Sequence, residues 1–284
     1  MSTGIHQLRV FFLGLFHIVR PGEIQPIAVG SGHKAWSLFK YLLFHRGTAI
    51  ATSDVMDLFW PNRIDSDDTS PLRTAVSRLK RTLEPNSQPY SRSSYIICTR
   101  DYCAFNTAAP LWVDAEEFEK KCNIARKTDI SNPATSAEIY FDALSMYRGD
   151  FLAEDVYVDW TMIPREHYRR LFLESSRDAA RRLLDAGDLQ RARIVLERAL
   201  QVDRFAEEMH LTYLKVLLEL GENAAVVEHY TYCTRLFYIE LGVLPSPELL
   251  KAYDKAKEGL GTTSQKISRF KAMTVPNHMK QNWT

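Results

Sequence analysis

Apolar and polar positions alternate with two different periods in the first third of the chain. Three apolar runs, separated by glycine and proline turns, predict short strands at Leu8–Leu13, Leu15–Val19 and Ile24–Val29. From about residue 32 the apolar spacing changes to three and four residues, and Trp36, Phe39 and Leu43 form the stripe typical of one helix face. We therefore expect a small antiparallel sheet followed by a first helix.

Two further helices are predicted between residues 52 and 83. The first is short, because Thr52 or Ser53 can cap it and the pair Trp60–Pro61 ends it. The next has Ser70 as its N-cap and Pro71 as its first residue, a position where proline fits because no N–H donor is needed there. Its apolar spacing predicts a buried face made of Leu72, Val76, Leu79 and Leu83.

The opposite face of this third helix is polar and basic. At about 100° per residue it contains Thr74, Ser77, Arg78 and Arg81, with Arg73 and Lys80 at its flanks. A hairpin is predicted next, with strands Tyr95–Thr99 and Tyr102–Phe105 around the turn Arg100–Asp101. A sheet, three helices and a closing hairpin are the element order of a winged helix, whose third helix enters the major groove of DNA.

The side chains on this face suit DNA. Arginine can bond the O6 and N7 atoms of guanine together, and serine or threonine can bond bases or phosphates. The candidate DNA-binding residues are Arg73, Thr74, Ser77, Arg78, Lys80 and Arg81 on the helix, with Arg92 and Arg100 at the hairpin, or wing. Any amphipathic helix exposes lysine and arginine, so a solvated face without DNA binding is the alternative interpretation.

The second half of the chain is predicted to be helical from Asp114 onward, and it contains an internal repeat. The segment Ala186–Asp188 recurs 34 residues later as Leu220–Glu222, and three further positions match in the same register: Ala192, Leu196 and Ala199 with Val226, Tyr230 and Cys233. A period of 34 is that of a tetratricopeptide helix pair, although two helical hairpins can also match by chance. Such repeats stack around a groove that commonly binds partners.

Length and charge support a division into domains. A chain of 284 residues predicts about two domains. The net charge of +1 divides into +4 for residues 1–110, −7 for residues 111–260 and +4 for residues 261–284. We expect a winged-helix DNA-binding domain over 1–110, a helical domain over 111–260 and a flexible basic tail over 261–284. The predicted fold class is mostly α with a small β part.

Several classes of protein are disfavoured by the sequence. The longest apolar stretch, Val10–Phe16, is too short for a membrane helix and lacks the flanks of a secretory signal, so we expect a cytoplasmic protein with no membrane contact. The sequence has no nucleotide-binding or hydrolase motif, and its eight histidines are scattered, which argues against an enzyme, a cofactor or a metal. Without zinc-finger spacing, the four cysteines are expected to be reduced, and a Cys98–Cys103 disulfide across the hairpin is the alternative.

Short segments in both halves resemble one known family. The runs Leu8–Gly14, Ala75–Leu83 and Tyr95–Phe105 look like the winged helix of transcriptional activators of the antibiotic-regulatory-protein (SARP) type. The second half looks like their bacterial transcriptional activator domain in the segments Asp114–Phe118, Ala143–Gly149, Trp160, Glu207–His210 and Glu240–Pro247. The resemblance implies binding to promoter direct repeats and recruitment of RNA polymerase through its σ and α subunits. Two adjacent repeats need two protomers, so we expect a homodimer on DNA.

Two further sites are candidates. In related winged helices the loop before the third helix contacts polymerase, and here that loop contains Asp65, Asp67 and Asp68, although a solvated turn is an equal alternative. A helix predicted over Pro164–Leu184 contains six arginines, a residue type that suits a small anionic effector such as a nucleotide: Arg165, Arg169, Arg170, Arg177, Arg181 and Arg182. Acidic residues three or four positions away can pair with these arginines and account for them without a ligand.

These patterns predict a sequence-specific activator of transcription. The competing hypothesis is a helical-repeat adaptor between proteins whose winged domain does not bind DNA specifically, because winged helices serve both purposes. Charge reversal at Arg78 and Arg81 separates the two hypotheses. It abolishes DNA binding under the first and has little effect under the second.

Overall fold

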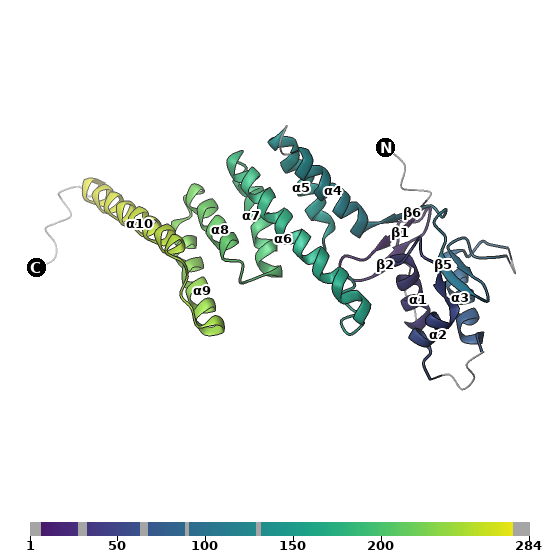
Figure 1. The fold of residues 1–284 in the computed structure, drawn as a ribbon. Helices are drawn as coiled ribbons and strands as arrows, with labels where there is room; N and C mark the ends of the chain where they lie inside the picture. The colour runs from purple at the N-terminus through teal and green to yellow at the C-terminus, as the bar shows by residue number, and fades with distance from the viewer. Residues whose placement is uncertain (1–6, 28–32, 63–67, 89–90, 129–131, 275–284) are drawn as a thin grey trace, which may run out of the picture. The chain divides into compact units, whose positions relative to one another are not determined.

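The chain folds into two compact units. The structure, a computed structural model, describes residues 7–27, 33–62, 68–88, 91–128 and 132–274. One unit comprises residues 1–115 with 152–155, and the other comprises residues 116–151 with 156–284. Figure 1 shows the first unit in purple and blue, with both sheets, and the second as a series of helices that ends in yellow.

The first sheet is assembled from segments about a hundred residues apart. Its central strand β1 (Leu8–Phe11) pairs antiparallel with β2 (His17–Val19) and parallel with β6 (Leu111–Val113). The strand predicted at Ile24–Val29 is wrong for residues 24–27, which form no strand, and residues 28–32 lie outside the described residues. The third strand of this sheet is instead β6, which pairs with β1. The first unit therefore extends beyond residue 110, the boundary that the sequence predicted.

The three predicted helices follow, with a second sheet against them. They are α1 (His33–Phe44), α2 (Thr52–Phe59) and α3 (Ser70–Leu83). The hairpin of β4 (Ile96–Cys98) and β5 (Tyr102–Phe105) is extended by a two-residue strand, β3 (Ile50–Ala51), which pairs with β5. Phe39 of α1 is fully buried and contacts Phe105 of the hairpin edge to face, so one core joins the helices to the wing.

The cysteines of the hairpin are joined. Cys98 and Cys103 are opposite each other in the β4–β5 register, their Cα atoms are 4.2 Å apart, and they form a disulfide. The expectation of reduced thiols is therefore wrong at these two positions, because the strand register brings the side chains together as a close cross-strand pair. Cys122 and Cys233 are free and buried.

The segment Leu152–Asp155 belongs to the first unit and hydrogen-bonds to the loop between β1 and β2. Leu152 N–H donates to the Phe12 carbonyl (2.8 Å), and Ala153 N–H donates to that of Gly14 (3.1 Å). The Glu154 carboxylate accepts from Phe16 N–H at 3.2 Å. These bonds hold Leu152 at φ 48°, a backbone region that is uncommon for residues other than glycine.

Asp114, near the C-terminal end of the first unit, binds the same loop after β1. Its buried carboxylate accepts backbone N–H groups of Phe12 (2.7 Å), Leu13 (3.0 Å) and Ala115 (2.7 Å). Burial raises the pKa of Asp114 to about 6, although the three donors act in the opposite direction. The loop after β1 is therefore organised by a carboxylate far away in the sequence.

This raised pKa predicts an unusual pH dependence of stability. The folded state binds a proton near pH 6, whereas an unfolded aspartate does so near the ordinary pKa of 3.8. The contribution of Asp114 to the free energy of unfolding should therefore rise by about 1 kcal/mol as the pH falls from about 7.5 to about 5. Urea unfolding of the native chain and of Asp114→Asn at both pH values tests this, because the asparagine variant lacks that increment. Equal pH slopes would contradict the prediction.

In the described residues the second unit is made of helices. They are α4 (Asp114–Thr128, whose first two residues belong to the first unit), α5 (Pro133–Met146), the 3-10 turn η1 (Asp159–Thr161), α6 (Met162–Asp185), α7 (Leu189–Val202), α8 (Glu207–Glu219), α9 (Asn223–Leu241) and α10 (Pro247–Thr274). No helix in the described part of the chain is long and apolar enough to cross a membrane.

Positions 34 residues apart in the repeat have the same structural role in α7 and α9 and in the turns before them. Gly187 and Gly221 both have φ 74° in the turns before α7 and α9, a conformation that favours glycine. The matched positions Ala199 and Cys233 are both completely buried. Residues 261–274, expected to belong to a flexible tail, are helical because α10 continues to Thr274, and residues 275–284 lie outside the described residues. No proline lies between Pro247 and Pro276, so no proline ring interrupts the helix between these two positions.

Candidate nucleic-acid interface

The third helix begins with a carboxylate cap. Both oxygens of Asp68 accept from Ser70, one from its N–H (2.8 Å) and one from its hydroxyl (2.9 Å), and these bonds lower the pKa of Asp68. The N-cap is Thr69, which makes no side-chain cap, so the prediction of Ser70 as N-cap is wrong by one residue. Pro71 lies in the first turn as the second helical residue, one position later in the helix than predicted.

Helix α3 has a buried apolar face and an exposed polar face as predicted, with a difference at one buried position. Leu72, Leu79 and Leu83 are buried, and Ala75 is buried in place of Val76, which is half-buried. The buried face packs against α1. Five of the six candidate DNA-binding residues on the helix are exposed: Arg73, Thr74, Ser77, Arg78 and Arg81. At about 100° per residue they occupy an arc of roughly 140°.

Two of the candidates are engaged within the protein. Lys80 is half-buried, and its Nζ donates to the Ser91 hydroxyl (2.7 Å), the Gln88 carbonyl (3.3 Å) and the Ser91 carbonyl. It therefore ties the segment before the wing to α3. The Thr74 hydroxyl donates to the Ser70 carbonyl one turn earlier at 2.9 Å, which leaves its oxygen able to accept.

The exposed arginines are available to a ligand. Among the described residues, neither Arg78 nor Arg81 forms an ion pair, and Arg73 has only a long-range attraction to Asp68. Glu84 could oppose their charge, but it is engaged by the wing, since its carboxylate accepts from the Ser93 hydroxyl (2.7 Å) and the Ser94 N–H (2.9 Å). The face keeps its positive charge without an internal counter-ion in this part of the chain.

The wing presents its two arginines to solvent. Arg92 precedes β4, Arg100 lies at the tip between β4 and β5, and both are exposed. The Thr99 hydroxyl shapes the tip by accepting N–H donors from Asp101 (3.2 Å) and Tyr102 (3.1 Å). A polar threonine therefore provides a turn at a tip that contains no glycine.

The sequence did not predict Arg20, a residue that positions α3. Arg20 Nε donates to the Thr82 carbonyl at 2.8 Å and holds the C-terminal turn of α3 beside β2. Its positive charge there also complements the negative end of the helix dipole. Local spacing gave no signal for this contact, because the two residues are 62 positions apart.

The acidic loop before α3 is only partly described. Asp65 and Asp67 lie outside the described residues. Asp68 is described, and its carboxylate is used to cap α3. It is therefore a structural residue of the helix, whatever the loop contacts.

The candidate arginines of α6 do not come together in one site. Arg165 donates to the Phe151 carbonyl and the Thr161 hydroxyl, both at 3.1 Å, and Arg169 donates to the Val202 carbonyl at 2.6 Å. A pocket of 480 Å³ is lined by Arg169, Arg170 and Arg177 but by neither Arg165 nor Arg181.

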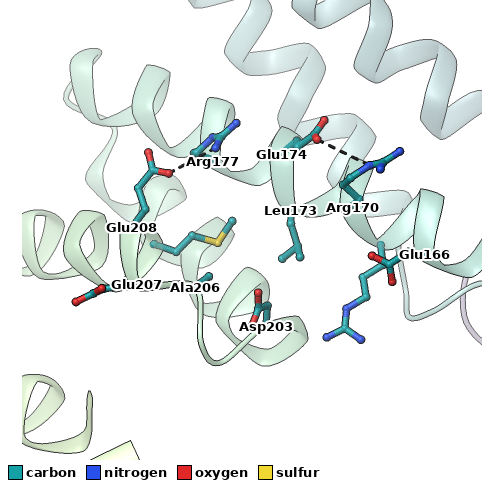
Figure 2. Close-up of a pocket in the computed structure, with 11 residues that line it drawn as sticks. Glu166, Arg170, Leu173, Glu174, Arg177, Asp203, Ala206, Glu207 and Glu208 are labelled. Atoms are coloured by element: carbon teal, nitrogen blue, oxygen red, sulfur yellow. Dashed lines mark hydrogen bonds and ion pairs between the residues drawn. The ribbon is translucent and has the colours of Figure 1, made fainter. Parts of the chain in front are cut away.

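Carboxylates outnumber arginines around this pocket. Arg177 pairs with Glu208 at 3.5 Å and Arg170 with Glu174 at 4.0 Å, as the dashed lines in Figure 2 show. The pocket is lined by five acidic residues: Glu166, Glu174, Asp203, Glu207 and Glu208. The arrangement supports the interpretation of paired surface charges over that of an anion site.

Comparison with known proteins identifies the second half. The family model of the bacterial transcriptional activator domain matches residues 113–256. The chain belongs to this family. Membership makes it a regulator of transcription, and it confirms the family that the segments of the second half resembled.

The fold of this family member has a solved counterpart over nearly its whole length. EmbR of Mycobacterium tuberculosis, in complex with a low-affinity phosphopeptide, is 15% identical with a TM-score of 0.63 over 95% of this chain and 72% of that one. The match confirms the winged helix followed by a tetratricopeptide-like domain as a fold. The Hsp90 co-chaperone Cns1 of Saccharomyces cerevisiae gives 14% identity and a TM-score of 0.37 over 56% of this chain and 44% of that one. No curated protein matches the chain.

Proposed function

We propose that this family member activates transcription by sequence-specific binding to direct repeats in promoters. The observation that supports the proposal best is the exposed arc of Arg73, Ser77, Arg78 and Arg81 on α3. An α-helix fits the major groove, and exposed arginines there can read guanine. Arg92 and Arg100 on the wing side would contact phosphates of the adjacent backbone.

The proposed complex contains two protomers on DNA. A direct repeat offers two copies of one half-site in the same orientation, and each winged helix has one recognition helix. We propose that the second protomer binds the second half-site and that the pair recruits RNA polymerase through its σ and α subunits.

A binding titration tests this function. The full chain is titrated against its own upstream region and against a scrambled duplex at about 50 and about 200 mM salt. The proposal expects the upstream region to bind about a thousandfold more tightly than the scrambled duplex, with two chains per bound site. Equal and steeply salt-sensitive binding to both duplexes, or no binding, would favour the adaptor hypothesis.

The polymerase contact is tested by separating activation from DNA binding. Because Asp68 caps α3, the variant changes only Asp65→Ala and Asp67→Ala. We expect it to lose most of the activation of a reporter promoter while its Kd for DNA stays within about twofold. The control is Glu248→Ala with Asp254→Ala, which removes two exposed acidic residues from α10. If both double variants activate equally well, the acidic loop is a solvated turn.

An anionic effector is left out of the proposed function. The candidate arginines of α6 are divided between backbone contacts and a pocket with more acidic than basic residues. The same titration with ATP and GTP added should give unchanged affinities, and a nucleotide-dependent shift would restore the effector hypothesis.

A further inference from the structure

A histidine from α8 meets a histidine and a cysteine from α9 inside the second unit. His229 and Cys233 are four residues apart and therefore lie on one face of α9. One ligand atom each from His210, His229 and Cys233 lies within 4.8 Å of the other two. His210 and Cys233 are buried to within 1% of complete burial, whereas His229 is half-buried and leaves a way in from the surface.

The hydrogen bonds prepare His210 to bind a metal. Its Nε2 lies 2.8 Å from the Arg204 carbonyl, which can only accept, so Nε2 carries the ring proton. The lone pair of Nδ1 is thereby directed at Nε2 of His229, 2.9 Å away. A backbone carbonyl that fixes the tautomer of a histidine is a common second partner in metal sites.

The surroundings suit a nitrogen and sulfur site that excludes bulk water. The rings of Tyr213, Tyr232 and Phe237 lie 4.7 to 6.3 Å from the two imidazoles. The charge of Glu207 acts on both His210 and Cys233, so it would offset the single positive charge of a divalent ion bound by two neutral imidazoles and a thiolate.

In the preceding helix pair, α6 and α7, the helices pack together without histidine or cysteine at the corresponding positions. At the positions 34 residues earlier, the same places are occupied by Ser176, Val195 and Ala199, which are also buried. A serine, a valine and an alanine therefore fill the equivalent space in α6 and α7. The change to two histidines and a cysteine in α8 and α9 calls for a chemical reason.

We propose that His210, His229 and Cys233 bind a divalent zinc-class cation that links α8 to α9, with water as the fourth ligand. Two imidazoles and a thiolate with an open fourth position are a zinc ligand set. Side-chain movements of about 1 Å would bring the three atoms to tetrahedral spacing. On binding, the Cys233 thiol loses its proton to solvent, and His229 carries its ring proton on Nδ1 so that Nε2 can bind. One proton is released for each ion bound.

Sequence spacing did not predict this site, because His210 is 19 residues from His229 and lies on another helix. The site stands apart from the proposed DNA-binding face, which is in the other unit. Its test therefore does not depend on whether the chain binds DNA.

Cobalt and zinc binding to the full chain test the proposal. The chain is purified with a chelator, and Co²⁺ is then added as a spectroscopic probe before Zn²⁺. We expect one ion per chain, a thiolate-to-cobalt charge-transfer band in the near ultraviolet that Zn²⁺ removes, and a rise in Tm of about 5 °C with excess zinc.

Three variants make the test specific. Cys233→Ala should lose the charge-transfer band and the rise in Tm, and alanine already fills the equivalent position 199. His229→Gln keeps an N–H donor for His210 but should weaken cobalt binding by about tenfold or more. Cys122→Ala, which changes the other free buried cysteine, should bind as the native chain does. The proposal is overturned if the folded native chain shows no charge-transfer band, or if the band survives in Cys233→Ala.

Discussion

Reversal of two charges on α3, Arg78→Glu with Arg81→Glu, should weaken binding to the upstream DNA by about a thousandfold. Both side chains are exposed on the proposed groove-facing arc, and each would exchange an attraction for a repulsion. The slope of log Kd against log salt should also fall by about one for each lost phosphate contact. The titration at two salt concentrations measures both quantities.

The matched control reverses two lysines elsewhere. Lys251→Glu with Lys255→Glu makes the same change in net charge on α10, where both residues are exposed and four positions apart. This variant should keep the specific affinity to within about threefold, because its charges are not on the face of α3 that is proposed to contact DNA. Equal losses in the two variants would mean that general attraction, and not the face of α3, governs binding. Loss in neither would favour the adaptor hypothesis.

Removal of the buried ammonium of α1 should destabilise the first unit by about 3 kcal/mol. Lys40 is 6% exposed, and its Nζ lies 3.0 Å from Glu154 and 2.6 Å from Asp155. It also lies 4.5 Å above the Phe16 ring. Lys40→Ala leaves the mostly buried carboxylate of Asp155 and the more exposed carboxylate of Glu154 without this partner, and hydrogen exchange of the α1 amides should show the loss.

Two comparisons show whether the buried charge is the cause. Lys121→Ala removes an ammonium that pairs with Asp142 at the surface, and it should cost less than about 1 kcal/mol. Lys40→Ala combined with Glu154→Gln and Asp155→Asn should recover part of the lost stability, because no uncompensated carboxylate remains. If Lys40→Ala costs no more than Lys121→Ala, the ion group does not hold Leu152–Asp155 to the first unit.

Elements with a local cause were predictable. The helix over Ser70–Leu83 follows from Pro71 and from apolar spacing, and the arc with Arg78 and Arg81 follows from the geometry of any helix. The hairpin around Arg100 was predictable for the same reason, since strand alternation and turn residues act over a few positions. The hydrogen bonds of Lys80 were not predictable, because its contact with Ser91 depends on the path of a loop eleven residues away.

The sequence by itself determined the three helices, the wing, the 34-residue repeat and the charge on the face of α3, because each of these depends on residues a few positions apart. Only the tertiary structure decided that β6 completes the first sheet, that Leu152–Asp155 belongs to the first unit, and that His210 meets His229 and Cys233. These features depend on contacts between residues distant in the chain, and such contacts have no signature in local spacing.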